Sequence, residues 1–436
     1  KAWSPDGRFL AVVGAASTFA QELHLLDVAT GALQPVLARP LGARFEQVAW
    51  LPDGDLLLLT DVDREHLGVA RLHREDGRLA WLVAPDADIE AMALDEAEAR
   101  LAVLVNHQGY GTLEVHDLVG GAAPRRWPSE GVLADLVWQP DGSALWATLA
   151  TPTRPPRPWR FTPATGAAAP LEGFAVAADG VEPALVHVAS FDGRRIPGFL
   201  YLPTGSPPDA GRPAVVMVHG GPESQWRPSF QGEVQACVAR GWTVLAPNVR
   251  GSTGHGRHYA ALDDRARRLD AVEDLACMAR WLAARPDVDA TRMAVMGQSY
   301  GGFMALATLL RQPELWCASV ELYGITDFAT LLRDTAAYRR NHRAAEYGEP
   351  SRDAALFAEI SPMRRIAELR APLFVAHGLS DPRVAPFESQ QLVDALEARS
   401  HPVTCVTVPH EGHGFVKRSN RLQVFGGVLD FLGGHL

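Results

Sequence analysis

A G-x-S-x-G pattern occurs at Gly297–Gly301, with Ser299 at its centre. The apolar run Met293–Met296 precedes it, and the helical pattern Gly302–Arg311 follows it. In this strand–turn–helix context the serine occupies a sharp, strained turn. Glycines two residues to either side avoid the clash that a side chain would cause there. The sequence therefore predicts that Ser299 is the nucleophile of an acyl-transfer reaction.

Histidines that could serve as the base follow two later apolar runs. His377 comes directly after residues 373–376, and His410 and His413 come after residues 403–408. The carboxyl ends of parallel strands meet at one edge of a sheet, so we expect these side chains near the serine. A histidine in that place takes the proton of the serine hydroxyl and returns it to the leaving group.

An acid that orients the base completes such a site, in the chain order serine, acid, histidine. Asp381 has the required place, and we expect it to hold the tautomer of His413 and to stabilise its imidazolium. The spacing alone leaves His410 and His377 as alternative bases and Asp327 as an alternative acid.

A His-Gly-Gly-Pro sequence at 219–222 follows the apolar run Ala214–Val218. The paired glycines allow backbone N–H groups to point into the site, where we expect them to form an oxyanion hole with the N–H of Tyr300. The alternative is an ordinary turn at the end of a strand.

Other charged residues near these motifs predict neither a metal nor a cofactor. Glu411 and the pair Asp263-Asp264 lack the spacing of metal ligands on one element, and we expect them to be solvated. A cluster of arginines at Arg339, Arg340 and Arg343 is typical of an exposed helix face. Its alternative role is to bind a peptide carboxylate bidentately.

The composition is that of a soluble globular protein of two or three domains. The chain has 436 residues, 47% of them hydrophobic and 21% charged, and a net charge of −10. That charge disfavours a nucleic-acid or anionic-membrane partner, and no apolar run approaches the ~18 residues of a membrane span. Four cysteines without a C-x-x-C pair indicate reduced thiols and a cytoplasmic location. The sequence does not determine the oligomeric state and is compatible with a homo-oligomer.

The first part of the chain, residues 1–180, is repetitive. W-x-P-D-G begins at Trp3, Trp50 and Trp138, which are 47 and 88 residues apart, and a degenerate copy is expected near residue 94. Tight turns between short apolar strands, at a period near 45, predict the blades of a β-propeller. We expect four blades; a β-sandwich is the alternative. Because Lys1 enters directly into a repeat, we expect the chain to be the C-terminal part of a longer protein.

The pattern changes after an Ala/Pro-rich stretch near 167–184. In residues 181–436, apolar runs alternate with helical patterns, which predicts βαβ units and a mostly parallel, doubly wound sheet. The expected strands are Leu185–Ser190, Ile196–Leu202, Ala214–Val218, Thr243–Ala246, Met293–Met296, Ala318–Leu322, Leu373–Ala376 and Val403–Val408. The expected helices include Asp270–Arg285, Gly302–Arg311, Pro386–Ala398 and Leu422–Leu432.

With these motifs the chain resembles the prolyl oligopeptidase family of serine peptidases, nearest to its acylaminoacyl-peptidase and dipeptidyl-peptidase-like branch. The resemblance rests on the stretches His219–Pro222, Asn248–Gly256, Gly297–Gly302, His377–Val384 and Glu411–Phe415. It implies an α/β-hydrolase domain preceded by a β-propeller, usually of seven or eight blades. It also implies Ser299, Asp381 and His413 as the triad, with the N–H groups of Gly221 and Tyr300 as the oxyanion hole.

The resemblance implies a serine peptidase that cleaves short peptides through an acyl-enzyme, since the propeller restricts access. Acylaminoacyl-peptidase or oligopeptidase activity is expected, and the lack of a Glu-Glu pair disfavours a dipeptidyl peptidase. We expect the aromatic residues Tyr323, Phe328 and Tyr338 to line the substrate pocket. The alternatives are a carboxylesterase of the same fold and a non-catalytic propeller scaffold.

Overall fold

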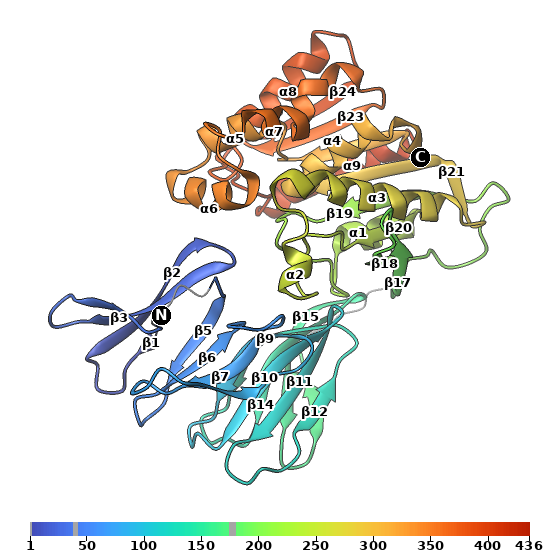
Figure 1. The fold of residues 1–436 in the computed structure, drawn as a ribbon. Helices are drawn as coiled ribbons and strands as arrows, with labels where there is room; N and C mark the ends of the chain where they lie inside the picture. The colour runs from blue at the N-terminus through green and yellow to red at the C-terminus, as the bar shows by residue number, and fades with distance from the viewer. Residues whose placement is uncertain (1, 38–41, 174–179) are drawn as a thin grey trace. The chain divides into compact units, whose positions relative to one another are not determined.

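The computed structural model describes residues 2–37, 42–173 and 180–436. It divides the chain into two compact units (Figure 1). The first contains the residues up to 179 together with the short segments 227–230 and 253–258, and the second contains the remainder. Residues 174–179 of the Ala/Pro-rich stretch lie outside the described residues.

The described part of the first unit forms four antiparallel sheets of four strands, each built from consecutive strands. These sheets are the predicted blades, one for each period of the repeat. Their strands are β1 (Ala2–Trp3), β2 (Phe9–Ser17), β3 (Ala20–Asp27) and β4 (Leu33–Pro35); β5 (Phe45–Trp50), β6 (Leu56–Thr60), β7 (Gly68–Leu72) and β8 (Leu79–Val83); β9 (Asp88–Leu94), β10 (Arg100–His107), β11 (Tyr110–Asp117) and β12 (Arg125–Pro128); β13 (Val132–Trp138), β14 (Leu145–Thr151), β15 (Arg154–Thr162) and β16 (Ala167–Pro170).

The repeated tryptophans connect successive blades. The indole N–H of Trp50 donates to the carbonyl oxygen of Ala2 at 2.9 Å, and that of Trp138 donates to Ala93 at 3.0 Å. The expected degenerate copy of the repeat is also present. Its Asp95 closes the turn between β9 and β10 by accepting the N–H of Arg100 at 2.9 Å. The same indole contact thus recurs between the first and second blades and between the third and fourth.

Alternation along the strands gives each inner blade two packed faces. In β6, Leu56 and Leu58 join a cluster with the preceding blade, whereas Leu57 and Leu59 join one with the following blade. Successive side chains of a strand point to opposite faces of its sheet. A strand whose blade packs against another blade on each face is therefore apolar along its length. This explains the unbroken run of four leucines in β6.

The second unit contains an eight-stranded sheet in the order β17-β18-β20-β19-β21-β22-β23-β24. The pairs β17–β18 and β18–β20 are antiparallel, and all the later pairs are parallel. The strands are β17 (Ala184–Ala189), β18 (Arg195–Tyr201), β19 (Arg212–Val218), β20 (Thr243–Pro247), β21 (Val288–Gln298), β22 (Ala318–Leu322), β23 (Leu373–Gly378) and β24 (Val403–Val408). The predicted α/β-hydrolase architecture, a mostly parallel sheet with crossover helices, is therefore confirmed.

Helices connect the parallel strands and bury the apolar sheet on both faces. They are α1 (Gly232–Ala239), α2 (Arg257–Ala260), α3 (Arg268–Ala283), α4 (Tyr300–Arg311), α5 (Phe328–Asp334), α6 (Ala337–Tyr347), α7 (Ala354–Ile360), α8 (Phe387–Glu397) and α9 (Arg418–Gly433). Val216 and Val295 belong to the core that contains α3 and α4. Their neighbours Met217 and Met296 instead face a cavity lined by α1 and α9. Among the described residues, no helix has the length and apolar character needed to cross a bilayer.

Replacing Leu306 of α4 by alanine tests whether this helix anchors the sheet. Leu306 is fully buried in the core that α4 shares with β21. Its truncation should lower the free energy of unfolding by about 2–5 kcal/mol because a cavity remains. The urea midpoint measures this loss. Leu422→Ala on α9, a side chain that is 65% exposed, should change the stability by only about 0.5 kcal/mol. Equal losses in the two variants would contradict this packing.

Candidate active site

Ser299 occupies a strained turn between β21 and α4. Its φ is 57° and its ψ is −121°, a conformation that costs a non-glycine residue on the order of 1–3 kcal/mol. Its N–H donates to the carbonyl oxygen of Leu322 at 2.9 Å. A Cβ at Gly297 would lie 2.0 Å from the carbonyl oxygen of Gly301, and one at Gly301 would lie 2.3 Å from that of Val218. The glycines are therefore a steric requirement of the turn.

A chain of hydrogen bonds joins the serine to a histidine and an aspartate. His413, in the loop after β24, places Nε2 2.8 Å from Ser299 Oγ. Its Nδ1 lies 2.6 Å from Oδ2 of Asp381, in the loop after β23. With the proton on Nδ1 donated to the carboxylate, Nε2 is free to accept the serine proton. The structure thus brings together the three residues that the sequence singled out.

The environment of Asp381 keeps this carboxyl group ionised. Burial alone would raise its pKa, but hydrogen bonds from His377 and His413 outweigh that effect and hold the pKa well below its usual value. Its other oxygen accepts the N–H of Arg383 at 2.8 Å and that of Val384 at 3.1 Å. The carboxylate is therefore fixed in position and able to stabilise an imidazolium at His413.

The alternative bases and the alternative acid have other surroundings. His377 is buried, with Nδ1 2.6 Å from Ser389 Oγ and Nε2 3.4 Å from Asp381 Oδ2, so it supports the aspartate. His410 is exposed at the turn after β24. Asp327 begins helix α5 by accepting backbone N–H groups and pairs with Arg364 at 3.0 Å.

The loop after β19 lies against Ser299. A Cβ at Gly220 would be 3.2 Å from Ser299 Cβ, and Gly221, with a φ of 130°, lines the same cavity as the serine. The loop is fixed by His219, whose Nε2 lies 2.9 Å from Ser252 Oγ. Burial lowers the pKa of His219 to about 4, so its imidazole is neutral at pH 7. The loop therefore brings Gly221 to the same cavity as Ser299, and Tyr300 follows the serine at the start of α4.

A buried ionic cluster contacts Tyr300, the residue that follows Ser299. The hydroxyl of Tyr300 donates to Asp263 at 2.9 Å, and Arg268 bonds both Asp263 at 2.8 Å and Glu346 at 3.0 Å. The prediction that Asp263 is solvated is therefore wrong, since its side chain is buried against a cation and a phenol. These contacts join helices α3, α4 and α6 directly beneath the serine.

Glu411 is likewise buried rather than solvated, which corrects a second prediction. Its carboxylate accepts the N–H groups of Val416 and Lys417, both at 3.0 Å, and the side-chain amide of Asn420 at 2.7 Å. These bonds hold the pKa of Glu411 below its usual value. They also close the loop that carries His413.

Residues 228–436 match the sequence profile of the prolyl oligopeptidase family. This part of the chain therefore resembles the serine peptidases of that family. A dipeptidyl aminopeptidase BIII of Pseudoxanthomonas mexicana is 33% identical over 256 residues, which cover 56% of this chain and 37% of that protein. The human acylamino-acid-releasing enzyme is 29% identical over 247 residues, covering 54% of this chain and 33% of that enzyme. The chain spans about a third of the length of the curated relatives that it matches.

Solved structures match both units. The crystal structure of a puromycin hydrolase superimposes with a TM-score of 0.90 at 23% identity, covering 99% of this chain and 68% of that one. An acylaminoacyl peptidase of Pyrococcus horikoshii gives a TM-score of 0.80 at 18% identity and covers 99% and 69% of the two chains. These likenesses show the fold of the prolyl oligopeptidase family, in which propeller blades precede an α/β hydrolase.

The aromatic residues expected in the substrate pocket have three different positions. Tyr323 packs edge-on against His413, with ring centroids 5.0 Å apart, and its hydroxyl bonds Gln298. Phe328 is fully buried in the core, whereas Tyr338 is 73% exposed on α6. Within the described residues, none of these three lines the cavity at the serine. They follow one strand in sequence, but Tyr323 lies in the loop after β22, Phe328 on α5 and Tyr338 on α6.

The three arginines considered as substrate ligands also have different surroundings. Arg340 is exposed and donates to the carbonyl oxygen of Arg333 at 2.8 Å. Arg343 forms ion pairs with Glu223 at 2.7 Å and Glu346 at 2.6 Å. Arg339 lines the cavity that contains Ser299 and His413.

Several residues of that cavity were not predicted from the sequence. The cavity of about 20 Å³ beside the serine is also lined by Ile325, Leu331, Thr335, Tyr347, Arg383 and Val384. The position of Arg383, two residues after the predicted acid, is a signal that the sequence did offer. The apolar members lie on several elements, and only the fold brings them together.

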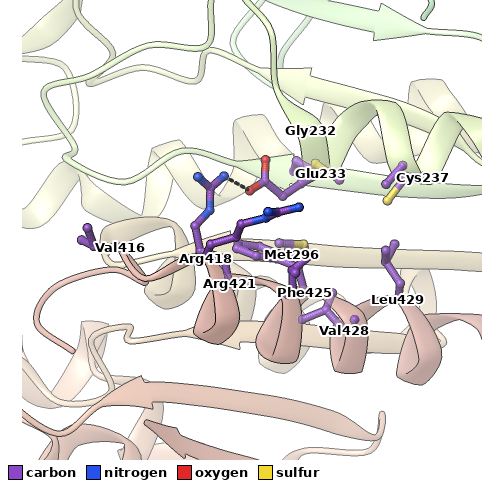
Figure 2. A pocket seen from close by; sticks show the side chains of 14 residues that line it. Gly232, Glu233, Cys237, Met296, Val416, Arg418, Arg421, Phe425, Val428 and Leu429 are labelled. Carbon is purple, nitrogen blue, oxygen red and sulfur yellow. Dashed lines mark ion pairs between the residues drawn. The ribbon is translucent and has the colours of Figure 1, made fainter. Parts of the chain in front are cut away.

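A second cavity of about 630 Å³ lies between α1 and α9 (Figure 2). Its lining is mostly apolar and includes Met217, Met296 and Phe425, with an ion pair between Glu233 and Arg421 at 3.6 Å. None of the triad residues lines it. The larger cavity therefore shares no lining residue with the cavity at Ser299.

The glycine at 301 offers a direct test of the strained turn. In Gly301→Ala the new methyl group would meet the carbonyl oxygens of Val218 and His219 at 2.3 and 2.8 Å. The turn and the facing loop must then separate, and we expect hydrolysis of a p-nitrophenyl ester to fall about 100-fold. Gly426→Ala, in α9, meets nothing within 4 Å and serves as the helical control. Full activity of a folded Gly301→Ala protein would contradict the steric argument.

Proposed function

We propose that the chain is a serine peptidase that hydrolyses short peptides through an acyl-enzyme, with acylaminoacyl-peptidase or oligopeptidase specificity. The observation that carries the proposal is the pair of hydrogen bonds that His413 forms, accepting from Ser299 at 2.8 Å and donating to Asp381 at 2.6 Å. The match of residues 228–436 to the prolyl oligopeptidase family supports it. The names of the relatives, which refer to release of dipeptides and acylamino acids, support a peptide substrate.

Acylation begins when Ser299 Oγ attacks the carbonyl carbon of the scissile bond. The hydroxyl proton passes to His413 Nε2 as the new C–O bond forms. Negative charge develops on the carbonyl oxygen, and the N–H groups of Gly221 and Tyr300 donate to it. The tetrahedral intermediate then collapses: the C–N bond breaks, and His413 transfers its proton to the leaving amine.

Deacylation repeats these steps with water as the nucleophile. His413 takes a proton from water, the hydroxide attacks the ester carbonyl, and the ester C–O bond breaks. The proton returns to Ser299 Oγ, and the carboxylic acid product leaves. Asp381 remains a carboxylate throughout and stabilises the imidazolium in both halves of the reaction.

The contact of Tyr323 with His413 supports a positioning role for this tyrosine rather than a place in the substrate pocket. Tyr323 packs on the ring of His413 and restricts its orientation.

All four cysteines carry free thiols. This state agrees with a reducing compartment, and we propose a cytoplasmic location.

One peptide supplied in N-acetylated and free forms tests the proposed function. We expect cleavage of the acetylated form, read by mass spectrometry, with release of an acetyl-amino acid. Ser299→Ala should lose it by about 10⁶-fold, because the nucleophile and its base act as a unit. Ser419→Ala, an exposed serine of α9, should retain it. Hydrolysis of a simple ester without cleavage of either peptide would instead identify a carboxylesterase. Undiminished cleavage by Ser299→Ala would contradict the proposal.

A further inference from the structure

The cavity beside Ser299 is lined by positively charged side chains. Three arginines line it, Arg339, Arg343 and Arg383, and no acidic residue of the described chain lines it with them. The chain as a whole has a net charge of −10. A local excess of cations at the nucleophile of an acidic protein attracts anionic ligands to this place.

Arg343 is not available to a ligand. Its guanidinium is paired with the carboxylates of Glu223 at 2.7 Å and Glu346 at 2.6 Å. Burial opposes its charge, but these carboxylates and Tyr347 outweigh burial and raise the pKa of Arg343 above its usual value. Arg343 therefore fastens α6 to the loop that carries Gly221.

Arg339 and Arg383 have no such partners. Neither guanidinium forms an ion pair or a hydrogen bond with any residue that the structure describes. Arg339 is half-buried, and its burial together with the charges of Arg343 and Arg383 lowers its pKa. A half-buried cation that is repelled by its neighbours is stabilised by a bound anion.

The backbone holds these two arginines beside each other and beside the triad. The hydroxyl of Thr335 donates to the carbonyl oxygen of Arg383 at 2.9 Å, and the N–H of Ala336 donates to that of Pro382 at 3.2 Å. The segment that leads into α6 is thus bonded to the segment that follows the catalytic acid. Arg383 also donates its own N–H to Asp381 at 2.8 Å.

We propose that Arg339 and Arg383 form a carboxylate-binding subsite, so that the enzyme prefers peptides with a carboxylate close to the bond that it cleaves. Two planar guanidinium groups match the oxygens of a carboxylate and bind it more strongly than a neutral amide. The inference rests on the proposed function because it names the substrate class of the same site. The carboxylate belongs either to an acidic side chain flanking the bond or to the free end of a very short peptide.

Matched pairs of peptides test the subsite. One pair has glutamate or glutamine on either side of the bond, and another has a free or an amidated C-terminus. We expect kcat/KM to be about 10- to 100-fold higher for the carboxylate member of one pair, which also identifies the source of the carboxylate. The ratio should fall towards one in Arg339→Gln/Arg383→Gln. It should persist in Arg340→Gln, an exposed arginine of the same helix.

A binding measurement separates this inference from the proposed function. Calorimetry compares N-acetylglutamate, which carries both kinds of carboxylate, with N-acetylglutamine amide, which carries none, on the Ser299→Ala protein, in which no reaction interferes. Tighter binding of the glutamate, lost in the additional Arg339→Gln/Arg383→Gln variant, supports the subsite even if no peptide is cleaved. Equal binding, or peptide cleavage with a ratio near one, overturns the subsite and leaves the peptidase intact. Loss of neutral-ester hydrolysis in the double arginine variant would show that the triad is damaged. The calorimetric comparison on the Ser299→Ala protein then decides whether the subsite binds a carboxylate.

Discussion

The site depends on one steric constraint, the close approach of three backbone segments around Ser299. The turn after β21, the start of α4 and the loop after β19 come so near that Gly297, Gly301 and Gly220 leave no room for a side chain. Packing of α4 on the sheet holds Ser299 at a φ of 57°. The hydroxyl thereby lies at the edge of the sheet where the loops after β23 and β24 present Asp381 and His413.

Buried charges hold these loops in place. Glu411 closes the loop of His413 by accepting two backbone N–H groups, and His377 supports Asp381. Beneath the turn, Arg268 joins Asp263 to Glu346. Each of these charges is paired or hydrogen-bonded, which offsets the cost of burying it. The positions of Ser299, Asp381 and His413 are thus supported by a further set of buried polar residues.

The sequence predicted those features whose cause is local. Gly297 and Gly301 flank Ser299 because of a clash within five residues, and the turn after each apolar run places Asp381 and His413 at one sheet edge. The burial of Asp263 and Glu411 could not be predicted in this way. It depends on partners such as Tyr300 and Asn420, which only the fold or the exact loop path brings near. For the same reason, proximity in sequence misplaced Phe328 and Tyr338, whose helix faces point elsewhere.

Covalent labelling of the nucleophile tests the central claim, that the triad geometry makes Ser299 alone reactive. A fluorophosphonate reacts with an activated serine by losing fluoride, and intact-mass measurement with peptide mapping locates the adduct. We expect a single adduct at Ser299, absent in Ser299→Ala and formed far more slowly in His413→Ala. Labelling at another serine, or equally fast labelling without His413, would contradict it.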